Sequence, residues 1–450
     1  MVRVTDMTHG RPIRLILLFS LPLMLGSVFQ QLYTIVDTII IGRGVGMQAL
    51  ASIGAADWIN WLVLWGLQGF TQGFAILAAQ EFGAGAYDRL RRVLAMIVKL
   101  SCWFGIAVTI ISLLLVRPLL TLLHTDPAVF GGAQTYLYVQ FGGSLIIIAY
   151  NMAAAVLRCL GDSRTPLFAI IAASFANIAL DLLFVMGFGW GIFGASFATV
   201  LAQLIAFLLC LRSLRRLPFV QLTKADWKTD PAILLHLCRL GIPTGLQMSM
   251  ITLGGMVLQS VLNGFGVVFV AGYTAANKLY GILESASVAF GYAMTAYMGQ
   301  NRGARNAARI DAGIRAVLAL SAGFTAAIVT AMLLAGKPLL GLFLSTEEAG
   351  AADALAVAYQ YLMVLMAFLF ALFMLQAYRS SLQGLGEMTV PTLSGFAEML
   401  MRMGAALVLP AFIGQSGVFF AEGAAWVCAA ALNLVWYYIR IGKIKREMMQ

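Results

Sequence analysis

Long apolar segments recur along the whole chain, and they constrain its fold more than any other feature of the sequence. Each segment is long enough to cross the hydrocarbon core of a bilayer, which takes about 20 residues of helix. Of the 450 residues, 61% are hydrophobic and 11% are charged, whereas a soluble domain carries about 25% charged residues. The sequence therefore predicts an all-α polytopic membrane protein.

We expect twelve membrane-spanning helices. They are predicted at residues 14–41, 50–79, 90–116, 133–157, 165–187, 191–211, 240–262, 267–298, 308–334, 356–382, 388–412 and 417–441. The polar N-terminal stretch runs directly into the first of these segments, so we expect no cleavable signal peptide. Five scattered cysteines without a CxxC pair argue against a disulfide framework and against a cysteine metal site.

The basic residues are distributed unevenly between the two sides of the membrane. If the N-terminus is cytoplasmic, nearly all loop arginines and lysines face inward, and only Arg43, Arg117 and Lys337 face outward. Loops rich in these residues stay in the cytoplasm, so we expect a multi-pass protein of the inner (plasma) membrane with both termini cytoplasmic. Topology and anionic lipid also explain the net charge of +10, which is therefore no evidence for nucleic-acid binding.

The two halves of the chain repeat each other. The turn QEFGAG from Gln80 matches QNRGAR from Gln300, and LRCLGDSRTP ending at Pro166 matches LQGLGEMTVP ending at Pro391. Because six spans is an even number, both halves enter the bilayer from the same side, related by a pseudo-twofold axis along the membrane normal. Two such lobes around a cleft are typical of a rocking transporter, although a duplicated scaffold does not by itself establish transport. The expected domains are an N-terminal six-helix lobe at 1–211, a cytoplasmic linker at 212–230 and a C-terminal six-helix lobe at 231–450.

Two carboxylates within spans of the first lobe have no counterpart at the matching positions of the second lobe. An ionised side chain in hydrocarbon costs about 2.5 kcal/mol or more, so Asp37 and Asp181 need a partner or a function. Asn177 shares a helix face with Asp181, and Thr199 lies at a similar depth on the next span. Hard oxygen ligands of this kind suit Na⁺, and two close carboxylates equally suit a shared proton. We predict a cation-coupling site here, with Pro22 as the hinge of the Asp37 helix; the alternative is that Asp37 only marks a helix end at the membrane interface.

Other polar residues are candidates for contact with cargo or for pairing. Glu284 has no cation at helical spacing, so it either faces the substrate or pairs across helices. Glu398 and Arg402 are four residues apart and are expected to neutralise each other, whereas Glu422 is expected to matter little for coupling. The candidates for the substrate cavity are Tyr33, Asn151, Glu284 and Met256.

Several motifs resemble one transporter family. These are FSLPLMLGSVFQQLYTIVDTIIIGR from Phe19, QEFGAG, LRCLGDSRTP, NIALDLLF and GQNRGA at Gly299. In this order, and with the duplication, they resemble the multidrug and toxic compound extrusion (MATE) family, in its bacterial DinF-like branch. The resemblance covers nearly the whole chain.

The resemblance implies a twelve-helix antiporter that exports organic cations or amphipathic compounds in exchange for H⁺ or Na⁺. It also implies that Asp37, Asn177, Asp181 and Thr199 form the family's first-lobe cation site, and Asn151 fits the family's pattern on the fourth span. An acidic pair that some members carry in the second lobe has no clear match here. We expect no cofactor other than the coupling ion, a monomer, and contacts with small molecules and membrane lipid.

Two other classes of protein remain as alternatives. A lipid-linked or polysaccharide-precursor flippase of the same superfamily would usually show a cationic cavity for its pyrophosphate, whereas most cations here are at the cytoplasmic ends. A membrane-embedded transferase would need clustered aspartates for Mg²⁺ or an intramembrane histidine, and His9, His124 and His236 lie outside the spans or at their edges. We therefore expect a transporter and not an enzyme.

Overall fold

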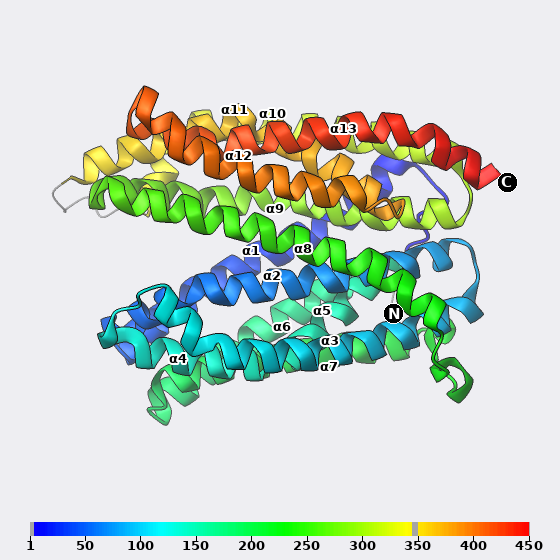
Figure 1. The fold of residues 1–450 in the computed structure, drawn as a ribbon, viewed down its shortest axis with the longest axis horizontal. Coiled ribbons are helices and arrows are strands. Elements are labelled where there is room, and N and C mark those ends of the chain that lie inside the picture. The colour runs from blue at the N-terminus through cyan, green and yellow to red at the C-terminus, as the bar shows by residue number, and fades with distance from the viewer. Residues whose placement is uncertain (1–3, 344–349, 450) are drawn as a thin grey trace. The chain divides into compact units, whose positions relative to one another are not determined.

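The computed structural model is built from helices (Figure 1) and describes residues 4–343 and 350–449. The long helices in the first half of the chain are α1 (Pro12–Gly44), α2 (Met47–Gly83), α3 (Tyr87–Leu122), α4 (Pro127–Gly142), α5 (Ser144–Cys159), α6 (Arg164–Asp181) and α7 (Gly191–Arg215). The remaining long helices are α8 (Pro231–Leu262), α9 (Val267–Gly303), α10 (Ala307–Gly341), α11 (Ala351–Gly384), α12 (Thr389–Ile413) and α13 (Phe420–Met449). The short segments are a π-helix, η1 (Leu182–Gly187), and the 3₁₀ turns η2 (Pro218–Val220), η3 (Lys224–Trp227), η4 (Asn263–Phe265) and η5 (Gln415–Phe419).

The helices account for the predicted spans. Within the described residues, ten helices are long and apolar enough to cross a membrane, and the bent pair α4 and α5 makes an eleventh. The twelfth predicted span falls on α9, which has 37 residues and carries the polar residues Asn277, Lys278 and Glu284. The chain is therefore a multi-pass all-α membrane protein.

The fourth span is bent, where the sequence predicted one segment at 133–157. Helices α4 and α5 meet at Gly143 with a bend of 50°. A Cβ atom on Gly143 would lie 2.5 Å from Cγ2 of Val200 on α7. Paired glycines such as Gly142 and Gly143 are common causes of a kink, and here the missing side chain also lets α7 pack closely.

The chain forms two compact units. Unit 1 consists of Leu21–Ser249 with the N-terminal residues up to Asp6, and unit 2 consists of Met250–Gln450 with Met7–Ser20. Helices α1 and α8 thus contribute residues to both units. The start of each of these two helices packs with residues of the opposite half of the chain. The lobes expected at 1–211 and 231–450, with the linker at 212–230, stay predictions.

Glycines on α2 and α8 explain why the start of α8 belongs to unit 1. A Cβ on Gly73 would lie 2.6 Å from the Cα of Gly241, and one on Gly69 would lie 2.7 Å from the carbonyl oxygen of Thr244. Small residues four apart allow two helix backbones to approach closely in a membrane protein. The spacing of Gly69 and Gly73, and of Gly241 and Gly245, fits this type of crossing.

Polar contacts explain why the start of α1 belongs to unit 2. The Met7 N–H donates to Oε1 of Gln300 at 2.8 Å. The Met7 carbonyl accepts from Asn301 Nδ2 at 3.1 Å and from Arg309 Nη2 at 2.8 Å. Further along α1, the Ser20 hydroxyl contacts the carbonyl oxygen of Ala289 at 3.3 Å. These contacts fasten the N-terminal segment to α9 and α10.

The linker between α7 and α8 is ordered by its own side chains. The N–H and hydroxyl of Thr223 both donate to Oδ2 of Asp226 at 2.7 Å. Burial tends to raise the pKa of Asp226, but these hydrogen bonds and the nearby Arg91 outweigh it and hold the pKa below the ordinary 3.8. Lys99 on α3 donates to the carbonyl oxygen of Trp227 at 2.6 Å, so the linker is also tied to unit 1.

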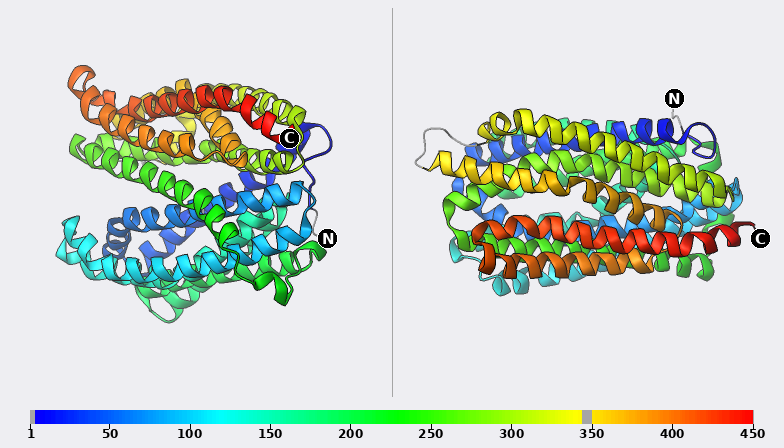
Figure 2. Two further views of the ribbon diagram at one scale, coloured as in Figure 1. Left: turned by 45° about the vertical axis from the view of Figure 1, so that its right-hand side comes forward. Right: turned by 90° about the horizontal axis from the view of Figure 1, so that it is seen from above.

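Each unit has a central helix. In unit 1, α7 packs against α4, α5 and α6, and in unit 2, α11 packs against α9, α10 and α13. Figure 2 shows α12 and α13 running beside each other within unit 2. The rings of Tyr273 on α9 and Tyr361 on α11 stack with centroids 4.4 Å apart.

Candidate functional site

A small apolar core positions the predicted cation residues in unit 1. It consists of Ile40, Ile41, Ala49, Val185 and Ala195, all buried. Ile41 is one helical turn beyond Asp37 on α1, and Val185 is one turn beyond Asp181. The core therefore holds α1 and the end of α6 together directly beside the two carboxylates.

Asp37 and Asp181 lie close enough for their carboxyl groups to interact electrostatically. Asp181 is fully buried and Asp37 is half-buried. Neither oxygen of Asp181, nor Oδ1 of Asp37, meets a hydrogen-bond donor among residues 4–343 and 350–449. Two neighbouring carboxylates repel each other, and the oxygens without donors lack solvation, so a shared proton or a bound cation would stabilise the pair.

The backbone changes conformation at Asp181. Helix α6 ends at this residue, and the π-helical turn η1 follows directly. Single π-turns within helices are rare and are frequently found at functional sites. One turn earlier, Asn177 is buried, and neither atom of its amide group has a hydrogen-bond partner in the part of the chain that the structure describes. A buried amide of this kind is costly unless a ligand or water satisfies it.

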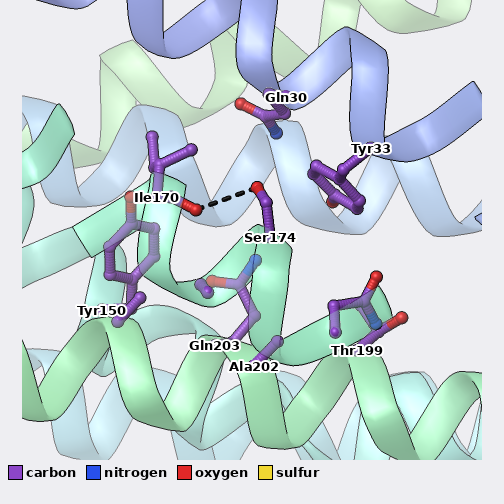
Figure 3. A pocket seen from close by; sticks show the side chains of 11 residues that line it. Gln30, Tyr33, Tyr150, Ile170, Ser174, Thr199, Ala202 and Gln203 are labelled. Carbon is purple, nitrogen blue, oxygen red and sulfur yellow. Dashed lines mark hydrogen bonds between the residues drawn. The ribbon is translucent and has the colours of Figure 1, made fainter. Parts of the chain in front are cut away.

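A cavity of about 50 Å³ lies next to these residues in unit 1 (Figure 3). Its polar lining residues are Gln30, Tyr33, Tyr150, Ser174, Asn177, Thr199 and Gln203. A water molecule needs about 10–15 Å³ of such space, so the cavity can hold an ion with a few waters. Pockets for drug-sized ligands are about 300–1,000 Å³, so this cavity is too small for the cargo itself.

The oxygen groups fit a monovalent cation. The Thr199 hydroxyl donates to the carbonyl oxygen of Ala195 at 3.2 Å, which leaves the lone pairs of its oxygen for a cation. Asp37, Asp181 and Asn177 add two carboxylates and an amide, all hard oxygen ligands of the kind that suits Na⁺. Within the described residues, no three His, Cys, Asp or Glu side chains gather as a metal-ion site.

The other predicted residues have different surroundings. Tyr33 lines the cavity, whereas Asn151 donates to the carbonyl oxygen of Ile147 at 3.0 Å on its own helix and is not among the lining residues. Pro22 lies inside α1, which continues as a helix on both sides. Met256 belongs to unit 2 and is half-buried. The roles of Asn151, Met256 and Pro22 therefore stay predictions.

Three lining residues were missed by the sequence reasoning: Gln30, Ser174 and Gln203. Helical spacing holds a signal for each of them, because Gln203 is four residues after Thr199, and Gln30 and Ser174 are each three residues before a predicted site residue. Residues three or four apart share a helix face. The Oε1 atom of Gln203 is buried and has no hydrogen-bond partner among the described residues.

Unit 2 contains a buried network of ion pairs across α11, α12 and α13. Arg402 contacts Glu398 at 3.0 Å, which confirms the predicted pair. The structure adds two members, since Arg379 contacts Glu398 at 2.5 Å and Arg402 also contacts Glu422 at 2.8 Å. Glu422, which the sequence reasoning treated as unimportant for coupling, is thus a partner in this network.

Glu284 lies on α9 near the same network. Its carboxyl group lies beside Tyr280, one turn earlier on the helix, and Glu422 and Arg402 lie within electrostatic range. Glu284 is half-buried. It therefore has a neutral partner on its own helix, and its contact with cargo stays a prediction.

Comparison with known proteins gives a consistent result. The MatE family model matches residues 22–183 and 243–408. The chain is 32% identical to the probable multidrug resistance protein YpnP of Bacillus subtilis (strain 168), over 99% of this chain and 98% of that protein. It is 23% identical to the multidrug export protein MepA of Staphylococcus aureus (strain NCTC 8325 / PS 47), over 94% of this chain and 93% of that protein.

Solved structures share the fold. A crystal structure of MATE in complex with MaL6 matches with a TM-score of 0.91 at 24% identity, covering 99% of this chain and 100% of that one. An outward-facing conformation of a multidrug resistance MATE family transporter of the MOP superfamily matches with a TM-score of 0.90 at 24% identity, covering 99% of each chain. At this level of identity the likeness concerns the fold alone.

Proposed function

Since the chain belongs to the multidrug and toxic compound extrusion (MATE) family, whose members are transporters and not enzymes, we propose that it is a secondary active multidrug antiporter. It exports organic cations or amphipathic compounds in exchange for H⁺ or Na⁺. The observation that carries this proposal is the neighbouring pair of Asp37 and Asp181, in which both oxygens of Asp181 and Oδ1 of Asp37 lack donors among the described residues. The names of the relatives, a probable multidrug resistance protein and a multidrug export protein, support the class of cargo.

The coupling ion acts by neutralising the carboxyl pair. Without a cation, Asp37 and Asp181 repel each other, and a proton or Na⁺ between them removes the repulsion. Asp37 lies on α1 downstream of Pro22, so a change in this repulsion can bend α1 at the proline. The ion shifts the conformational equilibrium only as far as its affinity differs between the two states. Removing the charge should therefore uncouple export from the ion gradient instead of merely slowing it.

Alternating access supplies the rest of the cycle. The two lobes rock about a central cleft, with cargo contacting Tyr33, Asn151, Met256 and Glu284. Both termini and the 212–230 linker face the cytoplasm, and the protein acts as a monomer in the inner (plasma) membrane. The uneven distribution of basic residues supports this orientation.

The proposal is tested by transport of a fluorescent organic cation in proteoliposomes, with Na⁺ and pH gradients imposed separately. We expect export by the wild type under at least one gradient. Asp37→Asn and Asp181→Asn should abolish gradient-driven export and retain cargo binding. The matched control is Asp88→Asn, whose side chain is 89% exposed and which should behave as the wild type. Gradient-driven export at wild-type rates in Asp37→Asn would contradict the coupling assignment.

A further inference from the structure

The cation site of unit 1 is built in layers along three helices. Ile41, Val185 and Ala195 belong to one apolar core, which sets the relative register of α1, the end of α6 and α7. Asp37 and Asp181 each precede their core residue by four positions, and Thr199 follows its core residue by four. Four residues of helix span about 6 Å. The three residues Asp37, Asp181 and Thr199 therefore form one polar layer, which we call the first layer, about one turn from the core.

A second layer lies one more turn away from the core. It consists of Tyr33, Asn177 and Gln203, each four residues from a member of the first layer and so on the same helix face. All three line the cavity, together with Thr199. The cavity therefore extends the first layer in the direction away from the apolar core. All members of the second layer are neutral, whereas the first layer holds both carboxylates.

Gln203 and Asn177 both line this cavity, and each carries an amide oxygen without a partner in the described part of the chain. The Oε1 atom of Gln203 and the Oδ1 atom of Asn177 are buried and meet no hydrogen-bond donor among residues 4–343 and 350–449. Figure 3 shows the amide group of Gln203 pointing toward Ser174 and into the space below Gln30. The Ser174 hydroxyl donates to the carbonyl oxygen of Ile170 at 2.9 Å and is thus engaged elsewhere.

These neutral oxygens can act as ligands for Na⁺ but do not take up a proton, so they bear on which ion the site binds. An amide oxygen is a hydrogen-bond acceptor and a ligand for hard cations, but it is not a group that titrates in proteins. A proton held by the carboxyl pair contacts neither amide oxygen, so only water in the cavity could satisfy these buried acceptors, and an unsatisfied buried acceptor is costly. A Na⁺ ion, directly or through one water, satisfies the carboxylates and the amides together.

We propose that Gln203 is an additional oxygen ligand of the coupling ion, and that with Asn177 it makes the site select Na⁺ over H⁺. This inference rests on the proposed antiport function. In this arrangement the partly hydrated ion lies at the second layer, and the carboxylates of the first layer supply the opposite charge. Gln203 is a neutral ligand, so its removal weakens Na⁺ binding without removing the charge that couples the ion to the cycle.

The test compares Gln203→Met with the wild type. Methionine has a similar length and no amide group. We expect export by the wild type to follow a Na⁺ gradient, and we expect Gln203→Met to raise the Na⁺ concentration for half-maximal export about tenfold, which corresponds to about 1.4 kcal/mol. The maximal rate should stay unchanged. The matched control is Gln259→Met on α8, where the amide bonds to Asn263 at 3.0 Å and where we expect no shift.

A second variant and a binding measurement separate ligation from folding. Na⁺ binding is measured by the rise in melting temperature of the purified protein when Na⁺ replaces K⁺ at constant ionic strength. At pH 8.5, Gln203→Glu keeps an oxygen at this position and adds a charge, so the Na⁺ concentration for half-maximal stabilisation should fall, in the direction opposite to Gln203→Met. A purely structural role of Gln203 would shift both variants in the same direction.

The outcomes that overturn the inference differ from those that overturn the function. If Asp37→Asn is uncoupled and Gln203→Met keeps the wild-type Na⁺ dependence, Gln203 is not a ligand and the antiport function stands. Export by the wild type under a pH gradient, with no response to Na⁺, would overturn this inference and leave the antiport function standing. If the wild type exports under neither gradient, the proposed function fails and this inference fails with it.

Discussion

The buried ion pairs of unit 2 yield a sharp prediction for Glu398→Gln. The side chain of Glu398 is 4% exposed and lies between Arg379 and Arg402, which are 4% and 6% exposed. Glutamine has nearly the same shape, so this substitution removes a charge without leaving a cavity. Arg402 would keep Glu422 as a partner, at 2.8 Å. Arg379 would keep the neutral Ser394 hydroxyl at 3.4 Å and would lose its carboxylate.

The expected loss of stability is large because a buried charge would lack its counter-ion. Breaking a buried ion pair by removing one partner costs about 3–5 kcal/mol. The matched control is Glu387→Gln, which breaks a pair with Arg440 at 2.8 Å whose side chains are more exposed, at 13% and 31%. Because solvent reaches this pair, breaking it should cost less than breaking the buried pair. We therefore expect Glu398→Gln to lower the melting temperature of the detergent-purified protein well below that of Glu387→Gln, with all scans at one rate because such unfolding is usually irreversible.

A double variant tests the cause. Replacing both members of a buried pair is often nearly neutral, because no charge is left alone. Arg379→Gln combined with Glu398→Gln should therefore melt at a higher temperature than Glu398→Gln alone. The reasoning is refuted if Glu398→Gln melts no lower than Glu387→Gln, or if the double variant loses the sum of the two single losses.

Three further predictions follow from other parts of the chain. Gly73→Ala should lower the free energy of unfolding by about 1–3 kcal/mol, because the new Cβ would lie 2.6 Å from the Cα of Gly241 on α8. The control is Gly54→Ala on the same helix, where a Cβ would have nothing within 4 Å among the described residues and where we expect no fall in the melting temperature. Asp226→Asn should lower the melting temperature at pH 7. The difference should shrink once the pH falls below the ordinary 3.8 and be lost as the pH passes through the lower pKa of the folded state, because this carboxyl group stabilises the folded state only while it is ionised. An equal difference at pH 3 would contradict this. A cysteine placed at Thr223, in a background without the native cysteines, should not react with an impermeant reagent in intact cells, and labelling there would reverse the proposed orientation.

The sequence predicts the spans well because the thickness of the bilayer sets their length. It also identifies Asp37 and Asp181, since a carboxylate within a span is costly enough to be informative by itself. Asn177 follows from Asp181, because positions four apart on one helix share a face whatever the tertiary structure. These inferences need only the geometry of a single helix and its solvent.

Contacts between helices could not be predicted in the same way. Arg379 and Glu398 belong to α11 and α12, and their contact depends on the rotation of each helix about its own axis. A sequence without an alignment gives no measure of that rotation. Gln203 was missed for the same reason, because its place beside Thr199 is evident only once the face of α7 toward the cavity is known. The attachment of the start of α8 to unit 1 likewise depends on a close crossing at Gly73 and Gly241, which composition does not reveal.

The packing of α1 indicates which element of unit 1 responds to the cation. From Leu21 to Ile39 this helix has one buried residue, Gly26, and its next buried residues are Ile40 and Ile41. Helices α6 and α7, in contrast, pack against each other, and α7 also packs against α4 and α5. Segments with few buried contacts open and move at the lowest cost. A charge change shared between Asp37 on α1 and Asp181 on α6 therefore displaces α1 more readily than α6, and the stretch between Pro22 and Asp37 is the part of unit 1 in which that displacement meets the least resistance.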